Sequence, residues 1–301
     1  MKLHKIRVIE KEEITEVSNF IARLNHNEQA HIGYCGTDGK EIAKSMREEI
    51  SDVKYTDSFV VAYENKQLIG VLGFDADLER NVAEIWGPFI LPDKWRISRD
   101  LWKKMTELLP PEISSLEMFP NSKNIHACDL ATSLSFKKSS DESILVFERG
   151  NGLELEQTTL ELEELTLAFY PNMKQLHDKA FPRAYYNGEQ IVNQIDAHRK
   201  VFIITKNSSF SGYIYVETEP EFGEASIEFF AVEESARGNG IGRQLLMGAL
   251  KWIFTFEDME SITLCVNSAN NKAINLYKKS GFRHVHDLCS FIKEIRPDRN
   301  K

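Results

Sequence analysis

Apolar side chains recur along the chain in short runs that alternate with stretches of helical spacing. In the second half, such runs predict strands at Phe202–Thr205, Gly212–Glu217, Ile227–Val232 and Ser261–Val266. Two stretches instead carry apolar residues three and four positions apart, which indicates helices at Arg243–Phe254 and Asn271–Ser280. Strands that alternate with helices predict an α/β domain.

The first half follows the same order of elements. Strands are predicted at Lys5–Ile9, Phe59–Ala62, Leu68–Phe74 and Ala83–Ile90, and helices at Glu12–Leu24 and Asp100–Leu109. Pro110 and Pro111 end the second helix, because proline cannot continue a helical hydrogen-bond ladder. The first half is therefore a second candidate α/β domain.

A repeat relates the two halves, because residues 121–136 align without a gap with residues 267–282. The identical pairs are Asn121/Asn267, Ser122/Ser268, Asn124/Asn270, Ala127/Ala273, Leu130/Leu276 and Phe136/Phe282. Self-similarity at a fixed separation indicates a duplicated unit. The turn-rich stretch from Arg149 to Gly152 is the expected join, so we predict domains at 1–150 and 151–301.

Composition narrows the class of protein. Of the 301 residues, 42% are hydrophobic and 28% are charged, which is enough apolar material for packed cores. The formal net charge of −9 comes without a basic stripe, which argues against a nucleic-acid partner because phosphate binding needs clustered Lys and Arg. An acidic surface is compatible with a cationic substrate such as an amine.

Targeting and redox signals are also informative. The chain starts without an apolar signal-peptide region, and it contains no run of 18 apolar residues, so we expect neither secretion nor membrane insertion. Its four cysteines are Cys35, Cys128, Cys265 and Cys289, and they are too far apart to form a zinc or redox motif. We expect reduced thiols and a cytoplasmic location.

A glycine-rich turn stands between a predicted strand and a predicted helix, at Arg237–Gly242. Glycine permits positive φ and close approach of a ligand, and the free N–H groups of a helix start attract anions, so this turn could cradle a pyrophosphate. The alternative is a turn that is glycine-rich for steric reasons only. The spacing fits neither the dinucleotide fingerprint nor the Walker loop, because Arg243 and Gln244 follow Gly242.

Two motifs together resemble the GNAT superfamily of N-acetyltransferases. Val232 followed by Arg237–Gly242 resembles the family's Arg/Gln-x-x-Gly-x-Gly/Ala signature, and the residues from Asn270 to Phe282 resemble its Asn-x-x-Ala-x-x-Leu-Tyr-x-x-x-Gly-Phe helix. The resemblance covers residues 225–282. It implies two tandem GNAT-like domains, each with a central mixed β-sheet flanked by helices, and acetyl-CoA as the acyl donor without a metal.

The resemblance also implies which residues contact the coenzyme. They are Ala231, Val232, Arg237, Gly238, Asn239, Gly240, Ile241, Gly242, Asn270 and Tyr277. In this interpretation the Val232 N–H polarises the thioester carbonyl. Three of these residues keep a plain alternative, since Val232 could be a strand core residue, Arg237 could hold the turn, and Asn270 could cap its helix.

Two side chains are candidates for proton transfer. Tyr277 is the expected general acid that protonates the leaving thiolate, unless it is an ordinary core tyrosine. Glu228 is the expected general base, because period-two alternation places it on the same face as Val232. Glu224 shares that parity and is a second candidate, and a water molecule is a third; Glu228 could equally be a solvated charge.

The acceptor amine is expected to bind the helical segment before the strands of the second half. Its aromatic and acidic residues suit a cation, although ordinary packing explains any one of them: His177, Asp178, Phe181, Pro182, Tyr185 and Tyr186. His284 and His286 share a predicted strand face but have no third ligand, so we expect them to be structural.

The first half lacks the residues of both motifs. Its turn at Leu91–Ser98 contains no glycine, Ala131 stands at the tyrosine position, and Ser135 replaces the glycine before Phe136. We therefore predict a degenerate copy that has kept the fold and lost the coenzyme.

The combined prediction is an N-acetyltransferase whose C-terminal domain transfers the acetyl group of acetyl-CoA to a primary amine by direct attack in a ternary complex. The amine belongs to a small molecule or a peptide. The main alternative is an acyl-CoA-binding regulatory protein without catalysis, and a weaker one is a structural interaction protein. The sequence leaves open whether the chain is a monomer or a homodimer.

Overall fold

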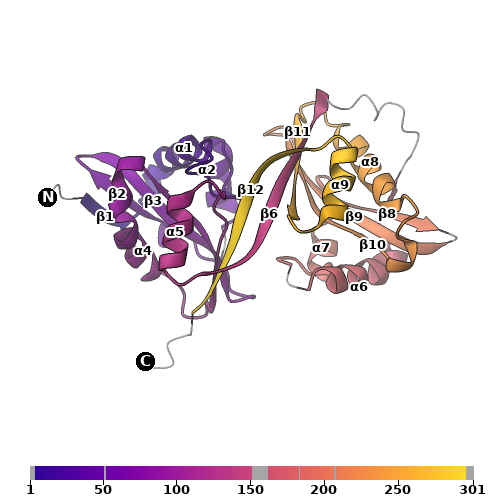
Figure 1. Cartoon of the computed structure of the whole chain (residues 1–301), viewed down its shortest axis with the longest axis horizontal. Helices are drawn as coiled ribbons and strands as arrows, with labels where there is room; N and C mark the ends of the chain where they lie inside the picture. Colours follow the sequence, from indigo (N-terminus) through magenta and orange to yellow (C-terminus); the bar gives the residue numbers. More distant parts are fainter. Residues whose placement is uncertain (1–3, 51, 151–161, 183, 207, 296–301) are drawn as a thin grey trace. The chain divides into compact units, whose positions relative to one another are not determined.

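The computed structural model describes the chain except residues 1–3, 51, 151–161, 183, 207 and 296–301. It contains two compact units (Figure 1). Unit 1 consists of Met1–Glu142 and His286–Lys301, and unit 2 of Ser143–Val285. Each unit is an α/β fold with its own hydrophobic cores.

Unit 2 carries a mixed sheet with the strand order β6-β11-β10-β9-β8-β7. Its strands are β6 (Lys137–Glu148), β7 (Glu163–Glu164), β8 (Arg199–Lys206), β9 (Ser209–Glu219), β10 (Glu224–Val232) and β11 (Ser261–Asn267). Its helices are α6 (Tyr170–Ala180), α7 (Gly188–Gln194), α8 (Ile241–Ile253) and α9 (Asn271–Lys279). β10 runs parallel to β11 and antiparallel to β9.

Helices cover both faces of this sheet. On one face, α8 packs its buried Leu245, Leu246 and Leu250 against Ile214 and Ile227. On the other face lies α6 (Figure 1). This helix buries Met173 and Leu176 in a second cluster that contains aromatic residues of β9 and β10. Burial of such side chains stabilises the fold by a free energy of roughly 25 cal/mol per Å² of apolar surface removed from water. The two cores therefore hold β10 between two helical layers.

Unit 1 repeats this arrangement with the strand order β1-β2-β3-β4-β5-β12. Its strands are β1 (His4–Val8), β2 (Val60–Glu64), β3 (Gln67–Asp77), β4 (Val82–Ile90), β5 (Ser115–Met118) and part of β12 (Arg283–Glu294). Its helices are α1 (Ile14–Asn25), α2 (Gly39–Glu48), α3 (Tyr55–Ser58), α4 (Ser98–Thr106) and α5 (Ile125–Ser133).

The lengths of matching elements support the predicted duplication. β3 and β9 both have 11 residues, β4 and β10 have 9, α5 and α9 have 9, and β6 and β12 have 12. The helices after the two central strands differ, since α4 has 9 residues and α8 has 13. The extra turn in the second half belongs to the helix that follows the glycine-rich loop.

The last strand of each half is divided between the units. β6 belongs to unit 2 from Ser143 onward, and β12 belongs to unit 1 from His286 onward. There β12 pairs antiparallel with β5, Phe291 opposite Met118. The compact units therefore differ from the predicted ranges 1–150 and 151–301, because alternation marks a strand without indicating its partner.

Unit 1 contains a row of carboxylates across three adjacent strands. Asp75 of β3 lies opposite Glu84 of β4, and Glu84 lies beside Glu117 of β5. Burial, reinforced by the charges of Asp75 and Glu117, raises the pKa of Glu84 to about 8. Burial, reinforced by the charges of Asp52, Asp77 and Glu49, raises the pKa of Asp75 to about 7. The folded state therefore holds protons that the unfolded chain releases at neutral pH.

We expect Glu84→Gln to stabilise the protein at pH 8. A carboxyl with a raised folded-state pKa destabilises the fold progressively as pH rises from its unfolded pKa near 4.5 to its folded pKa near 8. The gain should be roughly 1–3 kcal/mol at pH 8 and vanish near pH 4. Thermal unfolding at several pH values measures it. An equal effect at both pH values would contradict the argument.

Candidate active site

The parallel pairing between β10 and β11 stops halfway along β10. It runs from Glu224 opposite Ser261 to Ile227 opposite Leu264, whereas β10 continues to Val232 and β11 to Asn267. Over its second half β10 keeps its pairing with β9, with Val232 opposite Gly212. The two parallel strands thus diverge, and the edge of β10 that faces β11 is left for another extended chain to pair with.

A β-bulge at Glu228 causes part of this divergence. The register between β10 and β9 shifts between Ile227 and Phe229, so Glu228 is the extra residue. Ile227 packs on the α8 side, whereas Phe229, two residues later, packs on the α6 side. A regular strand would place both on the same face.

The bulge corrects one prediction from the sequence. Val232 packs on the α8 side. Glu228 accepts a hydrogen bond from the Tyr185 hydroxyl, and the Tyr185 ring lies 5.0 Å from that of Phe229 on the α6 side. Glu228 and Val232 therefore point to opposite faces, and the prediction of a shared face was wrong because the extra residue reverses the alternation.

The glycine-rich turn has the backbone that its sequence suggested. Gly238 has φ +81° and Gly240 has φ +77°, and at both positions a Cβ atom would meet no other atom within 4 Å. Positive φ disfavours other residue types there, and the open space leaves the backbone accessible. Gly242 differs, since its Cβ would lie 3.2 Å from Phe230 and 3.3 Å from Leu276. That glycine allows close packing.

Polar side chains brace this turn. The Arg237 Nε donates to the Val232 carbonyl over 3.2 Å, which ties the turn to the end of β10. The Asn239 amide donates to the carbonyl of Ala236 over 3.1 Å. Of the two interpretations of Arg237, the structure favours the one in which it holds the turn.

The start of α8 is free to bind an anion. Gly240 is its N-cap residue and has no side chain to cap the helix, so Ile241 begins a 13-residue helix without a side-chain cap. The first N–H groups of a helix have no intrahelical partner, and the macrodipole adds about half a positive charge there. The turn and the helix start together fit a phosphate group.

The second motif forms helix α9. The Asn270 side chain accepts a hydrogen bond from the Ala273 N–H over 3.2 Å, so Asn270 caps the helix, as Asn124 caps α5 in unit 1. Tyr277 is 6% exposed, and burial raises its pKa above the usual value, so the phenol stays protonated at neutral pH. Its ring lies 6.3 Å from that of Phe230 on the diverging half of β10.

The structure adds Glu217 of β9 to the candidate residues. Its carboxylate accepts a hydrogen bond from the Tyr215 hydroxyl and feels the charge of Glu228. Burial and the charge of Glu228 raise its pKa to about 7. The repeat could have indicated this residue, because β3 and β9 are matching strands of the two copies. Both have an acidic residue at their ninth position, Asp75 in β3 and Glu217 in β9.

The predicted acceptor residues divide into two groups. The fully buried His177 bonds to the Tyr213 hydroxyl at 2.6 Å and the Tyr186 carbonyl at 2.8 Å, and Asp178 accepts from the Gly188 N–H. These two residues hold the loop between α6 and α7. Tyr185 and Tyr186 are carried by that loop, and both interact electrostatically with Glu228.

Phe181 and Pro182 belong to the same loop. The Phe181 ring packs 5.3 Å from that of Phe229, which makes it part of the wall behind the tyrosines. Pro182 lies in the turn that follows Phe181. The aromatic part of the predicted acceptor site is thus assembled on β10, close to Glu228.

Glu224 is placed less favourably as a base. It is exposed at the start of β10, opposite Glu219. Eight residues separate it from Val232, which is roughly 25 Å along an extended strand. Glu228 lies about half that distance from Val232.

The predicted strand histidines lie on β12. The His286 ring packs 4.3 Å from that of His31, and burial lowers the pKa of His31 to about 4. Among the described residues, no group of three or more His, Cys, Asp or Glu side chains is arranged to hold a metal ion.

Unit 1 has no equivalent opening. The pairing of β4 with β5 also stops early, at Glu84 opposite Glu117, but the chain segment His31–Gly33 then pairs with the continuation of β5. The Gly33 N–H donates to the Phe119 carbonyl and the Asn121 N–H donates to the His31 carbonyl. The Pro120 carbonyl accepts from β12 on the opposite edge, so His31–Gly33 occupies the edge on the β4 side.

The turn before α4 is closed as well. Pro92–Ile97 form a 3₁₀-helix that runs directly into α4, with no residue at positive φ between them. Lys94 is bound to Glu64 over 2.8 Å, and the Trp95 ring stacks on His126 at 4.9 Å. Ala131 stands at the position of Tyr277, and Ser135 takes the positive φ that Gly281 has in unit 2.

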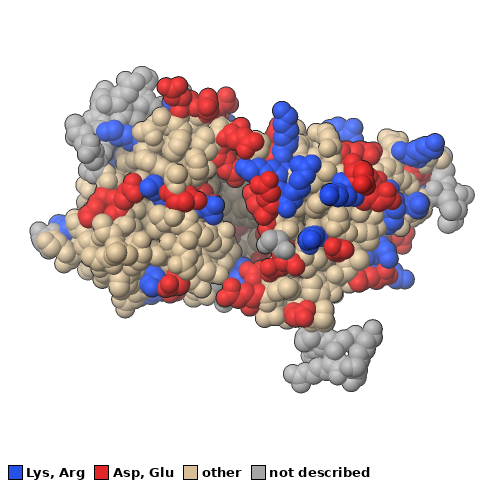
Figure 2. Space-filling view, turned by 180° about the vertical axis from the view of Figure 1, so that it is seen from behind, with Lys and Arg blue, Asp and Glu red and all other residues tan. Residues whose placement is uncertain are grey.

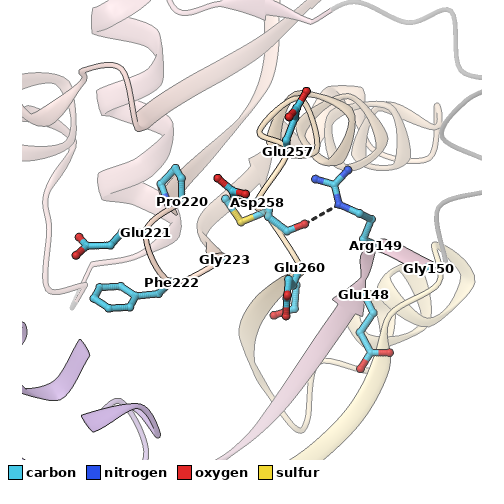
Figure 3. A pocket seen from close by; sticks show the side chains of 12 residues that line it. Glu148, Arg149, Gly150, Pro220, Glu221, Phe222, Gly223, Glu257, Asp258 and Glu260 are labelled. Atoms are coloured by element: carbon cyan, nitrogen blue, oxygen red, sulfur yellow. Dashed lines mark hydrogen bonds between the residues drawn. The ribbon is translucent and has the colours of Figure 1, made fainter. Parts of the chain in front are cut away.

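A surface pocket lies at the other end of β10 (Figure 3). It is lined by Gly223, just before Glu224, and by acidic residues that include Glu221, Glu257 and Asp258. Beside it, the Arg149 Nε donates to the Met259 carbonyl over 2.7 Å and fixes the chain after α8. This pocket is separate from the glycine turn, which follows the Val232 end of the strand.

Comparisons with known proteins agree with this geometry. Residues 161–282 match the model of the acetyltransferase (GNAT) family. This part of the chain is therefore a GNAT-family domain, and the whole chain has a tandem GNAT fold, which confirms the resemblance drawn from the motifs. The match supports an acyltransferase, and the family generally binds acetyl-CoA or another acyl-CoA. No curated protein sequence matches the chain.

Three solved structures share the fold over nearly the whole length. A GCN5-related N-acetyltransferase from Sphaerobacter thermophilus has 13% identity and a TM-score of 0.72, covering 98% of this chain and 96% of its own. A tandem GNAT protein from the clavulanic acid biosynthesis pathway has 13% identity and a TM-score of 0.66, and the match covers 97% of this chain and 98% of that protein. A putative acetyltransferase from Pyrococcus horikoshii has 13% identity and a TM-score of 0.61, and the match covers 99% of this chain and 92% of that protein.

The capping asparagines provide a test of the site. We expect Asn270→Ala and Asn124→Ala each to destabilise the protein by about 1 kcal/mol, because each removes a helix N-cap. If Asn270 also contacts the coenzyme, only Asn270→Ala weakens acetyl-CoA binding. Denaturant unfolding and titration calorimetry measure the two effects. An equal loss of binding in both variants would show that Asn270 acts through stability alone.

Proposed function

We propose that the protein is an acetyl-CoA-dependent N-acetyltransferase that acetylates a primary amine of a small molecule or peptide. The observation that carries this proposal is the combination in unit 2 of a diverging strand pair with an uncapped helix start directly behind it. A pantetheine chain pairs with the free edge of β10, and the pyrophosphate binds the N–H groups at the start of α8. The family match supports the general activity, acyl transfer.

The diverging half of β10 supplies the oxyanion contact in this proposal. Ala231 and Val232 lie at its end, and the Val232 N–H donates to the thioester carbonyl oxygen. The Gly238–Gly242 backbone and Asn239 form the phosphate cradle, which Arg237 holds against the strand. Asn270 lies at the start of α9, where its amide can contact the coenzyme while its oxygen caps the helix.

The acceptor enters from the α6 side. Its cationic amine is attracted by Glu228, Glu217 and the tyrosine rings of the α6–α7 loop. The amine must lose a proton before its nitrogen attacks the thioester carbon. Glu228 is our first choice for the proton acceptor, and Glu217, with its pKa of about 7, is poised to take the proton at neutral pH.

The leaving group needs a proton in return. When the carbon–sulfur bond breaks, the coenzyme leaves as a thiolate and takes a proton from the Tyr277 hydroxyl. Burial keeps this phenol neutral until that moment. The attacking nitrogen releases its remaining extra proton to solvent, and solvent returns a proton to the Tyr277 phenolate. The products are the acetylated amine and free coenzyme A.

We propose further that unit 1 is a degenerate copy that binds no coenzyme. Its own segment His31–Gly33 pairs with the continuation of β5, on the side where β4 and β5 part, and its turn before α4 has no glycine. A single site per chain follows. The competing function is an acyl-CoA-binding regulatory protein, which predicts coenzyme binding without turnover of any amine.

Location and assembly stay predictions. In the part of the chain that the structure describes, no helix is long and apolar enough to cross a membrane. Acidic and basic side chains lie beside one another on the face shown in Figure 2. We keep the cytoplasmic location, the absence of a nucleic-acid partner, and a monomer or homodimer as expectations.

Coenzyme binding can be tested at one glycine. Gly240→Asp should weaken acetyl-CoA binding about tenfold or more, since it places a negative charge at the phosphate position. Gly240→Asn is the matched control, because asparagine tolerates positive φ and adds no charge. Ser98→Asp, at the start of α4, should change nothing. Titration calorimetry gives affinity and stoichiometry, and two coenzymes per chain would overturn the degenerate-copy proposal.

The proton-transfer roles can be tested by thiol release with acetyl-CoA and a panel of amines. Glu228→Gln should lower kcat/KM about 100-fold and Tyr277→Phe should lower kcat about 10-fold or more, with coenzyme binding retained. Glu219→Gln, an exposed change on β9, is the control and should stay near wild type.

The pH profile distinguishes the two glutamates. If Glu217 accepts the proton, kcat/KM rises with pH through about 7, because the carboxylate form is needed, and Glu217→Gln abolishes that rise. If the rise persists in Glu217→Gln, that residue only orients the site. Tight coenzyme binding without thiol release for any amine would favour the regulatory protein.

A further inference from the structure

Two cysteines that are remote in sequence meet in unit 1. Cys128 lies on α5 and Cys289 on β12, and both contact the segment Pro120–Asn121, Cys128 through its sulfur and Cys289 through its backbone N–H. The two thiols are close enough to couple electrostatically. The Cys289 thiol also lies 3.7 Å from an oxygen of Asp141, which forms an ion pair with Lys138. The wide spacing of the cysteines, from which we expected no redox motif, therefore hides a pair in space.

Both thiols are held in place by their surroundings. The Cys289 N–H donates a hydrogen bond to the Pro120 carbonyl over 2.8 Å, and Cys289 is only 7% exposed. Cys128 is half-buried, and its sulfur lies 3.9 Å from the Asn121 carbonyl. Both residues are thus fixed against the same short segment, Pro120–Asn121.

The pair is specific to unit 1. Cys128 is the fourth residue of α5, and the fourth residue of α9 is Ile274. Cys289 is the seventh residue of β12, and the seventh residue of β6 is Ser143. Since the repeated fold packs with other side chains at these positions in unit 2, it does not require two thiols.

We propose that Cys128 and Cys289 are an oxidation site that forms a reversible disulfide when the protein meets a peroxide. Neither cysteine belongs to the proposed coenzyme or acceptor site, so this inference is independent of the acetyltransferase proposal. The bond joins α5, from the first half of the chain, to the strand that the second half contributes to unit 1.

Cys289 is the attacking sulfur. Hydrogen bonding from the Cys128 thiol and the positive charge of Lys138 lower the pKa of Cys289 below its ordinary value. Its thiolate attacks one peroxide oxygen and breaks the O–O bond, which yields a sulfenic acid and, after protonation of the leaving hydroxide, water. The Cys128 sulfur then attacks the Cys289 sulfur and displaces a second hydroxide.

The step balances without another reactant. Two thiols lose two hydrogens to hydrogen peroxide, which is reduced to two molecules of water, and one sulfur–sulfur bond forms. A dithiol reductant reverses it. In a reducing compartment such a pair stays reduced until an oxidant arrives, which distinguishes it from a structural disulfide.

The test is peptide mapping of the full chain after brief exposure to hydrogen peroxide and alkylation of the remaining thiols. We expect a linked pair of peptides that contain Cys128 and Cys289, lost on treatment with dithiothreitol. Cys265, which is exposed, should be alkylated or singly oxidised, and Cys265→Ser should leave the linkage unchanged. Cys128→Ser should remove the linkage and leave Cys289 to oxidise further to sulfinic acid.

A second readout guards against variants that fold poorly. In the wild-type protein the oxidised form should show a higher thermal unfolding midpoint than the reduced form, and the difference should disappear in Cys128→Ala and in Cys128→Ser. The proposal is overturned if wild-type Cys128 and Cys289 remain alkylatable after Cys265 has been oxidised. Linkage of either cysteine to Cys35 or Cys265 instead would also contradict it.

Discussion

The proposed chemistry of unit 2 depends on one constraint, that β10 cannot pair with β11 beyond Ile227. The bulge at Glu228 turns the strand at this point, so that Phe229 packs under α6 while Val232 stays on the α8 side. The irregular residue thus coincides with the end of the parallel pairing and turns a carboxylate toward the tyrosines on the opposite face. The glycine turn and the start of α8 follow directly from the end of that strand.

Unit 1 shows what the same fold does when the opening is filled. There the strands also part early, and His31–Gly33 satisfies the backbone groups that would otherwise be exposed. In the described part of unit 1, chain pairing thus provides hydrogen-bond partners at the point where the two parallel strands part.

Much of the fold could be predicted from periodicity and repeats. The predicted strand Ile227–Val232 lies within β10, the helix Arg243–Phe254 overlaps α8, and Asn271–Ser280 corresponds to α9. The bulge, the exchange of β6 and β12 and the contact of Cys128 with Cys289 could not, because each depends on which segments meet in space. Glu217 was missed because its burial beside Glu228 also depends on such contacts, although its correspondence with Asp75 of β3 was a signal in the sequence.

Hydrogen–deuterium exchange with and without acetyl-CoA tests the central claim most directly. We expect slower amide exchange at residues 229–232 and 238–243 when the coenzyme is present, because the N–H groups there that have no backbone partner gain one. Exchange at residues 31–33 and 91–101 should not change. Protection in the first copy, or unchanged exchange throughout the turn and the start of α8, would contradict the account.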